Sequence, residues 1–340
     1  MNEEEKTKKS ENQIETKINN TNNQTKTLEN YQLKTTLKFH SNSVCHLIIL
    51  KDSRIASSST DNSVKIFNKE TYKIDINIVH KDFIVHIIQL KNNNLLSSCS
   101  DNFIRIFNIY ENSYKIFQIL FSHEKPVKKT IELNNDFLAS CSWDKTIKIW
   151  NKNSKGYYFL NETIFKNNAV HSVYEISNDR IICVSGSLFA TNNDKMICFY
   201  QNKKNQYKKI KSIENISIIG FQNNFLKIND RFVLFGGYEI INFIDIIDYC
   251  INNIYTKYYS NNLFHCFHLL NDNNFLVGTC SDLIHFQIND NNIDIISRKN
   301  NIHGGDEDGW EAISCINQNL NGEIFTVSYD GSIKVWSLFN

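Results

Sequence analysis

The sequence predicts an all-β protein built from a repeated unit of short strands. The clearest unit lies at 123–151, where an apolar run at 127–133 is followed by a polar turn and by a second apolar run that ends in Ser-Cys-Ser. A third run at 146–150 alternates apolar and polar residues. Short runs of this kind, separated by polar turn residues, are typical of antiparallel strands. Each unit therefore predicts three strands joined by two tight turns.

The same unit recurs along the chain with fixed internal spacing. Three copies share a His, an Asp 21 residues later and an aromatic residue 6 residues after the Asp. These copies are His40, Asp61 and Phe67; His80, Asp101 and Phe107; and His123, Asp144 and Trp150. A fourth copy, which begins at His303, repeats the 6-residue step from Asp330 to Trp336. A period of about 40 residues indicates a repeat architecture.

The four copies resemble the WD40 repeat family through the segments SSSTDNSVKIFN, SCSDNFIRIFN, SCSWDKTIKIWN and SYDGSIKVWS. Units of that family are four-stranded blades of a β-propeller. The resemblance therefore implies an all-β, seven-bladed WD40-like β-propeller. The pattern is weakest at 167–300. Because this architecture hosts many functions, the resemblance alone does not assign one.

We expect the blades in the following order along the chain. Blades one to three occupy about 40–66, 80–107 and 123–150, with outer strands at 72–79 and 114–121. The strands of blade four are expected near 170, at 180–187 and at 195–200, and those of blade five at 216–228, 232–237 and 240–247. Blade six runs from 263 through 275–282 to 288, and blade seven covers 312–336. Blades four and five, about 167–257, are degenerate.

The first residues of the chain have a different composition from the rest. Residues 1–30 consist mainly of Glu, Lys, Asn, Thr and Gln, so we expect a disordered polar tail followed by the propeller at 31–340. The last copy ends four residues after Trp336 and lacks its outermost strand. In the WD40 family an N-terminal strand often completes the last blade. The resemblance therefore implies that the strand at 31–39 closes the ring and removes two open sheet edges.

The repeated polar residues are interpreted as a structural network inside each blade. In the family, a His, a Ser or Thr two residues before the Asp, the Asp and a Trp form a hydrogen-bonded chain. The corresponding residues are His40, Ser59 and Asp61; His80 and Asp101; His123, Ser142, Asp144 and Trp150; and His303, Ser328, Asp330 and Trp336. Only blades three and seven have the whole set. Phe67, Phe107 and Cys99 replace members elsewhere and are expected to weaken those blades by about 1 kcal/mol per hydrogen bond.

The same residues do not indicate an enzyme. A catalytic Ser-His-Asp triad has no reason to repeat around a chain, whereas a scaffold element does. The sequence has no G-x-S-x-G elbow and no Gly-rich phosphate loop. Histidines also recur near the start of inner strands (His46, His86, His171, His265), but without metal-ligand spacing inside any segment, so we expect no metal site and no cofactor.

Composition limits the remaining classes of function. The 37 Lys and Arg residues balance 36 Asp and Glu residues, so the basic excess expected of a nucleic-acid-binding protein is absent. The nine cysteines include no Cys-x-x-Cys pair, which favours free, buried thiols in a reducing compartment. No apolar run approaches the length of a membrane span, and the N-terminus has no signal-peptide pattern. These features predict a soluble, monomeric propeller in the cytoplasm or the nucleus.

The family's contact positions give the candidate binding residues. They flank the first apolar residue of an inner strand, as Phe83, Lys128 and His171 do, or directly precede the Asp, as Trp143 and Tyr329 do. An aromatic side chain in a polar turn is either an ordinary surface residue or an anchor for a partner. A sixth candidate, Trp310, follows the acidic segment 304–309, which is either a solvated insertion or a contact for a basic partner.

The function expected from these observations is a non-enzymatic scaffold that binds other proteins on one propeller face, within a multi-subunit assembly. One alternative is substrate recognition for a ubiquitin ligase, although the Arg that one such adaptor carries soon after a blade Trp is replaced by Asn151 and Lys152. A second alternative is an enzyme with a site at the central channel. Binding of phosphoinositide or RNA is disfavoured by the near-zero net charge and by the lack of a paired-Arg motif.

Overall fold

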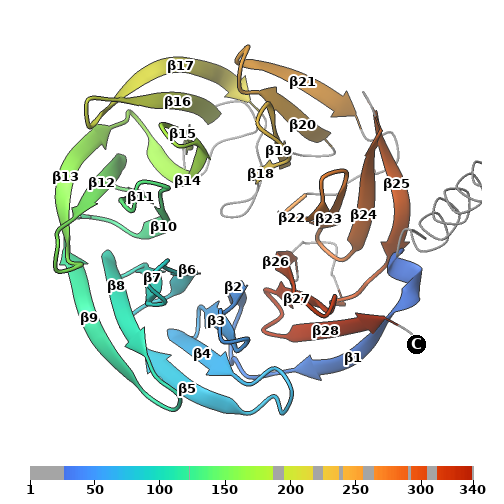
Figure 1. Ribbon diagram of the computed structural model, residues 1–340. Coiled ribbons are helices and arrows are strands. Elements are labelled where there is room, and N and C mark those ends of the chain that lie inside the picture. Colours follow the sequence, from blue (N-terminus) through green and yellow to red (C-terminus); the bar gives the residue numbers. More distant parts are fainter. Residues whose placement is uncertain are drawn as a thin grey trace, which may run out of the picture.

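The computed structural model is a closed ring of seven four-stranded antiparallel sheets (Figure 1). It describes residues 27–121, 123–186, 195–216, 225–236, 240–255, 264–289, 292–304 and 312–338. The expected all-β, seven-bladed propeller is confirmed. Within this part of the chain, no helix is long and apolar enough to span a bilayer.

Blades one to three are regular four-stranded meanders that run from the inner to the outer strand. Their strands are β2 (Val44–Ile49), β3 (Ile55–Ser59), β4 (Ser63–Phe67) and β5 (Ile74–Val79); β6 (Ile84–Gln89), β7 (Leu95–Cys99), β8 (Phe103–Ile109) and β9 (Tyr114–Phe121); and β10 (Val127–Glu132), β11 (Leu138–Ser142), β12 (Thr146–Lys152) and β13 (Tyr158–Phe165). The inner strands are almost fully buried because neighbouring blades cover both of their faces. This burial explains why their sequences read as apolar runs without strict alternation.

Blades four to six have four strands each, in spite of their degenerate sequence pattern. They consist of β14 (Ala169–Ser177), β15 (Arg180–Gly186), β16 (Lys195–Lys203) and β17 (Gln206–Ile216); β18 (Phe225–Lys227), β19 (Phe232–Gly236), β20 (Ile240–Asp245) and β21 (Cys250–Tyr255); and β22 (Cys266–Asn271), β23 (Asn274–Gly278), β24 (Leu283–Asn289) and β25 (Asn292–Lys299). Ile216, expected to open blade five, instead ends the outer strand of blade four. The inner strand β18 has only three residues, which left little pattern for the sequence to show.

The N-terminal strand closes the ring. Strand β1 (Tyr31–Leu37) pairs with β28 (Ile333–Leu338), so blade seven has the order β1, β28, β27 (Ile324–Ser328) and β26 (Ile313–Gln318). The ladder extends from the pair Tyr31 and Leu338 to the pair Leu37 and Ile333. The expected closing strand is therefore confirmed, and Figure 1 shows β1 beside β28 at the seam.

The segment before β1 is also packed against the propeller. The 3-10 helix η1 (Leu28–Asn30) buries Leu28, and the backbone N–H of Leu28 donates a 2.8 Å hydrogen bond to the Ser297 hydroxyl of β25. Leu28, which the sequence assigned to the tail, instead packs between blades six and seven. Residues 1–26 lie outside the described residues.

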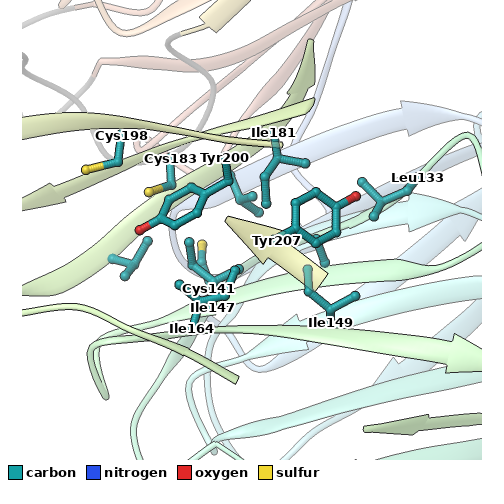
Figure 2. Packing of buried hydrophobic residues seen from close by; sticks show 13 residues of the cluster. Leu133, Cys141, Ile147, Ile149, Ile164, Ile181, Cys183, Cys198, Tyr200 and Tyr207 are labelled. Atoms are coloured by element: carbon teal, nitrogen blue, oxygen red, sulfur yellow. The ribbon is translucent and has the colours of Figure 1, made fainter. Parts of the chain in front are cut away.

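The hydrophobic core lies between adjacent blades rather than in one central cluster. Figure 2 shows the cluster between blades three and four, where Ile147 and Ile149 of β12 pack with Ile181 of β15. Two blades approach each other closely at Gly278 of β23, where an added Cβ atom would lie 2.8 Å from the Cβ of Ile313 in β26. Flat, well-filled interfaces of this kind hold the ring rigid, so that its loops keep fixed positions.

Candidate partner-binding face

The turn between the second and third strands of blade one is held by its Asp. His40 Nδ1 lies 2.8 Å from Asp61 Oδ2, and His40 Nε2 lies 2.8 Å from the Ser57 hydroxyl. Ser63 donates a 2.6 Å hydrogen bond to Asp61 Oδ1, and the backbone N–H of Ser63 donates a second one of 3.0 Å. A partly buried carboxylate needs several donors, and these groups supply them.

Blades three and seven extend this network to a tryptophan. In blade three, His123 Nδ1 lies 2.7 Å from Asp144, and both His123 Nε2 and Trp150 Nε1 contact the Ser140 hydroxyl, at 2.8 and 2.9 Å. Blade seven repeats the arrangement with His303 at 3.0 Å from Asp330 and with Thr326 in place of the serine. Its contacts are His303 Nε2 to Thr326 at 2.9 Å and Trp336 Nε1 to Thr326 at 3.0 Å.

The hydroxyl that contacts the histidine differs from the one expected. The expectation named the residue two before the Asp, whereas the structure uses the residue four before it. The serines two before the Asp bind the turn instead: Ser59 and Ser142 donate to loop carbonyl oxygens, and Ser59, Ser142 and Ser328 accept the backbone N–H of their Asp. Residues two apart in a strand share a face, so both serines lie on the same side of the blade, and the one four before the Asp contacts Nε2.

Blade two lacks the bond between His and Asp. His80 Nε2 lies 2.9 Å from the Ser97 hydroxyl, but Asp101 is bound by the Arg105 guanidinium at 3.0 and 2.6 Å. In the described part of the chain, His80 Nδ1 has no hydrogen-bond partner. Cys99, expected to break the hydroxyl contact, does not do so, because that contact belongs to Ser97. Blade two is therefore held by a carboxylate–guanidinium pair in place of the imidazole.

These networks change the ionisation of their carboxylates. Burial alone raises the pKa of Asp330, but hydrogen bonds from His303 and Ser332 outweigh it and lower the pKa to about 2. The same balance lowers the pKa of Asp61 and Asp144. Each of these three turns therefore keeps a charged, hydrogen-bonded carboxylate at neutral pH.

The residue before each Asp lies beside the entrance to the inner strand of the same blade. The backbone N–H of Trp143 donates to Pro126 O at 3.2 Å, and that of Tyr329 donates to Ala312 O at 3.1 Å. Blades one and two repeat the contact, from Thr60 to Ser43 and from Ser100 to Phe83. The candidate positions at the start of the inner strands and those before the Asp residues therefore lie on one face of the propeller. We call it the entry face; it consists of the loops that lead into the inner strands and the turns that contain the Asp residues.

Trp143 and Lys128 form a pair on the entry face. The Lys128 ammonium lies 4.4 Å from the centroid of the Trp143 ring, a cation–π contact, and only 7% of Lys128 is exposed. Burial lowers the pKa of Lys128. Trp143 is half-buried, and among the described residues its indole N–H has no hydrogen-bond acceptor. The pair thus places a half-buried aromatic ring on the entry face, with a buried lysine packed against it.

The other candidates differ in how much surface they offer. Phe83 is 46% exposed, and Tyr329 is half-buried, with its pKa raised by burial. His171 is only 3% exposed, with Nε2 at 3.3 Å from Gly186 O, so it offers a partner little surface. Trp310 and the acidic segment before it, apart from Gly304, lie outside the described residues.

The sequence interpretation missed a row of exposed apolar residues on the same face. Val79, Phe121 and Phe165 end the outer strands of blades one to three and are 69, 67 and 79% exposed. Each pairs with the residue two after the Asp position, namely Ser63, Phe103 and Thr146, which places all three at the outer edge of the entry face. We call them the apolar rim. The signal in the sequence is an apolar residue one or two positions before a repeat begins.

Comparisons with known proteins agree with this geometry. The family model for the WD domain, G-beta repeat (WD40), matches residues 31–68, 115–151 and 302–337. The chain therefore carries three WD40 repeats within a seven-bladed β-propeller. The three matches cover blades one, three and seven, which are the blades with a direct His–Asp contact. The three inner strands of blade two, which uses Arg105 instead, are not matched.

Among solved structures, the crystal structure of the WD40 β-propeller domain of Doa1 is similar to this chain, with a TM-score of 0.69. The similarity covers 90% of this chain and 97% of that one at 19% sequence identity, and it shows the fold. No curated protein sequence matches the chain. WD40 propellers generally bind other proteins and are generally non-catalytic.

The inner strands of this WD40 propeller carry buried histidines. The rings of His46 and His86 lie 4.5 Å apart, and burial, together with nearby Lys129, lowers the pKa of His46 to about 3. In the described ranges, no group of three or more His, Cys, Asp or Glu residues is arranged to hold a metal ion. These histidines are neutral at physiological pH and pack as part of the ring.

Proposed function

We propose that this WD40 propeller is a non-enzymatic scaffold that binds a partner protein on the entry face of blades one to three. The observation that carries the proposal is the apolar rim, in which three equivalent blade positions expose most of an apolar side chain. Single exposed apolar residues are common on protein surfaces, but a repeated row on one face is typical of an interaction site.

The neighbouring residues provide the other parts of an interface. Phe83 extends the apolar surface toward the inner strand of blade two. Trp143 offers a half-buried aromatic ring, with the Lys128 ammonium against it. Tryptophan is enriched among the residues that dominate binding energy at interfaces. A partner with apolar side chains would complement this surface.

The proposal is tested by affinity capture from native extract with matched baits. One variant combines Val79→Ser, Phe121→Ser and Phe165→Ser, and a second combines Phe83→Ala with Trp143→Ala. The control is Leu320→Ser, because this fully exposed leucine lies in the turn between β26 and β27, at the opposite end of the blade. Lys128 is left unchanged because replacing a buried residue threatens the fold. Thermal melts establish that each bait is folded.

We expect a set of proteins that the wild type and Leu320→Ser both capture and that at least one entry-face variant loses at least tenfold. Equal capture by all baits would place binding elsewhere on the protein. If no bait enriches a protein above background, the scaffold proposal fails and a screen for enzymatic activity follows.

Two narrower expectations belong to the same proposal. Membership of a multi-subunit assembly predicts that the captured proteins also co-purify with one another. Substrate recognition for a ubiquitin ligase predicts that ligase subunits occur among them. The cytoplasmic or nuclear location expected from the sequence stays a prediction, which microscopy of the tagged chain tests directly.

A further inference from the structure

Blade four contains two cysteines that face each other across a strand pair. Cys183 of β15 and Cys198 of β16 are direct partners in the antiparallel register, and both are fully buried. Figure 2 shows their sulfur atoms pointing the same way, next to the hydroxyl of Tyr200. Cα atoms of directly opposed residues in antiparallel strands are about 4.5–5.5 Å apart. A disulfide bond spans about 4.4–6.8 Å between Cα atoms, so the pair is within bonding reach.

A lysine from the neighbouring blade lies against one of the two sulfur atoms. Lys166 follows β13 in blade three, and its ammonium lies 2.9 Å from Cys198 Sγ and 3.2 Å from the Tyr200 hydroxyl. The backbone N–H of Lys166 donates a 2.8 Å hydrogen bond to Lys145 O, which fixes the lysine beside the Asp144 turn. A cation in direct contact with a sulfur favours the thiolate, the reactive form of cysteine.

The two thiols respond to this environment in opposite directions. The hydrogen bond from Cys183 and the contact with Lys166 lower the pKa of Cys198, although burial opposes them. The same hydrogen bond and burial raise the pKa of Cys183, which keeps its proton. Burial instead raises the pKa of the other buried thiols, Cys45, Cys99, Cys141, Cys266 and Cys315. Cys198 is therefore set apart from the structural cysteines of the propeller.

We propose that Cys198 is a nucleophilic thiolate that hydrogen peroxide oxidises, and that Cys183 then closes a disulfide bond with it across blade four. In the first step the Cys198 sulfur attacks one oxygen of the peroxide. The O–O bond breaks, Cys198 becomes a sulfenic acid, and the hydroxide that leaves takes a proton from solvent. In the second step the Cys183 sulfur attacks the Cys198 sulfur, the S–O bond breaks, and the departing hydroxide takes the proton of Cys183 to form water.

Lys166 also gives the proposal its route of access to a buried sulfur. Its side chain is half-buried and contacts Cys198, and the preceding residue, Phe165, is 79% exposed on the apolar rim. We expect peroxide to enter when this long side chain moves. The inference does not depend on the proposed function, since it concerns the chemistry of the isolated propeller.

The test uses purified full-length protein, limiting hydrogen peroxide at pH 7, and mass spectrometry after blocking of free thiols. Trypsin cleaves after Lys195, so Cys183 lies in peptide 181–195 and Cys198 in peptide 196–203. We expect a disulfide-linked pair of these two peptides, formed at least tenfold faster than any oxidation product of Cys141 or Cys315. Both reference thiols are buried but have no lysine ammonium at hydrogen-bond distance among the described residues.

Three variants separate the role of Lys166 from an effect on the fold. Lys166→Met is expected to slow the reaction at least tenfold, whereas Lys166→Arg retains the charge and is expected to slow it less. Lys145→Met is the control, because this neighbouring lysine is exposed.

A fourth variant tests the pairing with Cys183. In Cys183→Ser the reaction is expected to stop at the sulfenic acid of Cys198, which dimedone traps on peptide 196–203. Thermal melts show which variants are folded.

A second measurement follows alkylation of Cys198 by iodoacetamide as a function of pH. The inflection is expected below the ordinary cysteine pKa of about 8.5, and Lys166→Met is expected to raise it. Alkylation of Cys198 only after unfolding, together with no linked peptide, would overturn the proposal. A trapped sulfenic acid in the wild type without the linked peptide would overturn the pairing with Cys183.

Discussion

At the scale of single residues, the blade network depends on one hydroxyl in each blade. In blade three, the Ser140 hydroxyl lies between His123 and Trp150, so it joins the inner part of the blade to the third strand. The sequence motif identified the His, the Asp and the Trp, because these residues are rare and their spacing is fixed. It did not identify Ser140, because serines stand both two and four residues before Asp144, and only the register decides between them.

Replacing this hydroxyl is expected to destabilise the protein. Ser140→Ala leaves the Trp150 indole N–H and His123 Nε2 without their buried partner, and an unsatisfied buried group costs about 1–3 kcal/mol. Urea unfolding measures the change. The matched control is Ser58→Ala, since the Ser58 hydroxyl is equally buried but has no hydrogen-bond partner among the described residues. Equal losses in the two variants would show that the network contributes nothing beyond packing.

At the scale of strands and blades, the fold was largely predictable. Blades one, two, three and seven follow from the repeated motif, and the closing strand follows from the incomplete last copy. Blade five was misplaced at its inner edge because β18 has only three residues. The juxtaposition of Cys183 and Cys198 was not predictable, because it depends on the register of β15 and β16 and on the lysine contributed by blade three.

The close contact between blades six and seven makes a specific prediction. Gly278→Ala introduces a Cβ atom 2.7 Å from Cys266 Sγ and 2.8 Å from the Cβ of Ile313, so the blades must separate or repack. We expect a loss of roughly 1–3 kcal/mol in the free energy of unfolding, measured with urea. Gly322→Asn serves as control, because Gly322 has open space around it and Asn tolerates its positive φ. A near-neutral Gly278→Ala variant would contradict the tight interface.

The closing strand is expected to be essential for the closed ring. A chain that starts at residue 38 lacks β1, which leaves the edge of β28 unpaired and exposed to other chains. We expect a lower melting temperature and oligomers in size-exclusion chromatography. A chain that starts at residue 27 retains η1 and β1 and is expected to behave as a monomer. Monomeric behaviour of both truncated chains would show that closure is dispensable.

At the scale of the whole molecule, buried histidines make the ring sensitive to acid. Burial lowers the pKa of His46 to about 3 and that of His80 and His265 to about 4, below the ordinary value of 6.5. The unfolded chain therefore binds protons more readily than the folded one as the pH falls below 6.5. The stability that the neutral histidines contribute is fully present above pH 6.5. It is lost as the pH falls from 6.5 toward the pKa values of these histidines in the folded protein.

Unfolding by urea at pH 7 and at pH 5 measures this dependence. At pH 5, each histidine with a pKa near 4 in the folded protein is expected to lower the free energy of unfolding by roughly 2 kcal/mol relative to pH 7. This value follows from 1.36 kcal/mol per unit of pKa difference. His46→Gln is expected to reduce the pH dependence, although Lys129 and His86 still face that position. If stability is lost only below pH 4, acid unfolding is caused by protonation of the carboxylates in the Asp turns and not by the histidines.

The seam between β1 and β28 also has a consequence for protein synthesis. Strand β1 is translated long before its partner β28. At roughly 5–20 residues per second, the intervening segment of about 300 residues takes on the order of 15 s to a minute to appear. Throughout this interval β1 lacks its native neighbour. The nascent chain must therefore keep a strand edge unpaired until β28 has been translated, and the ring can close only then.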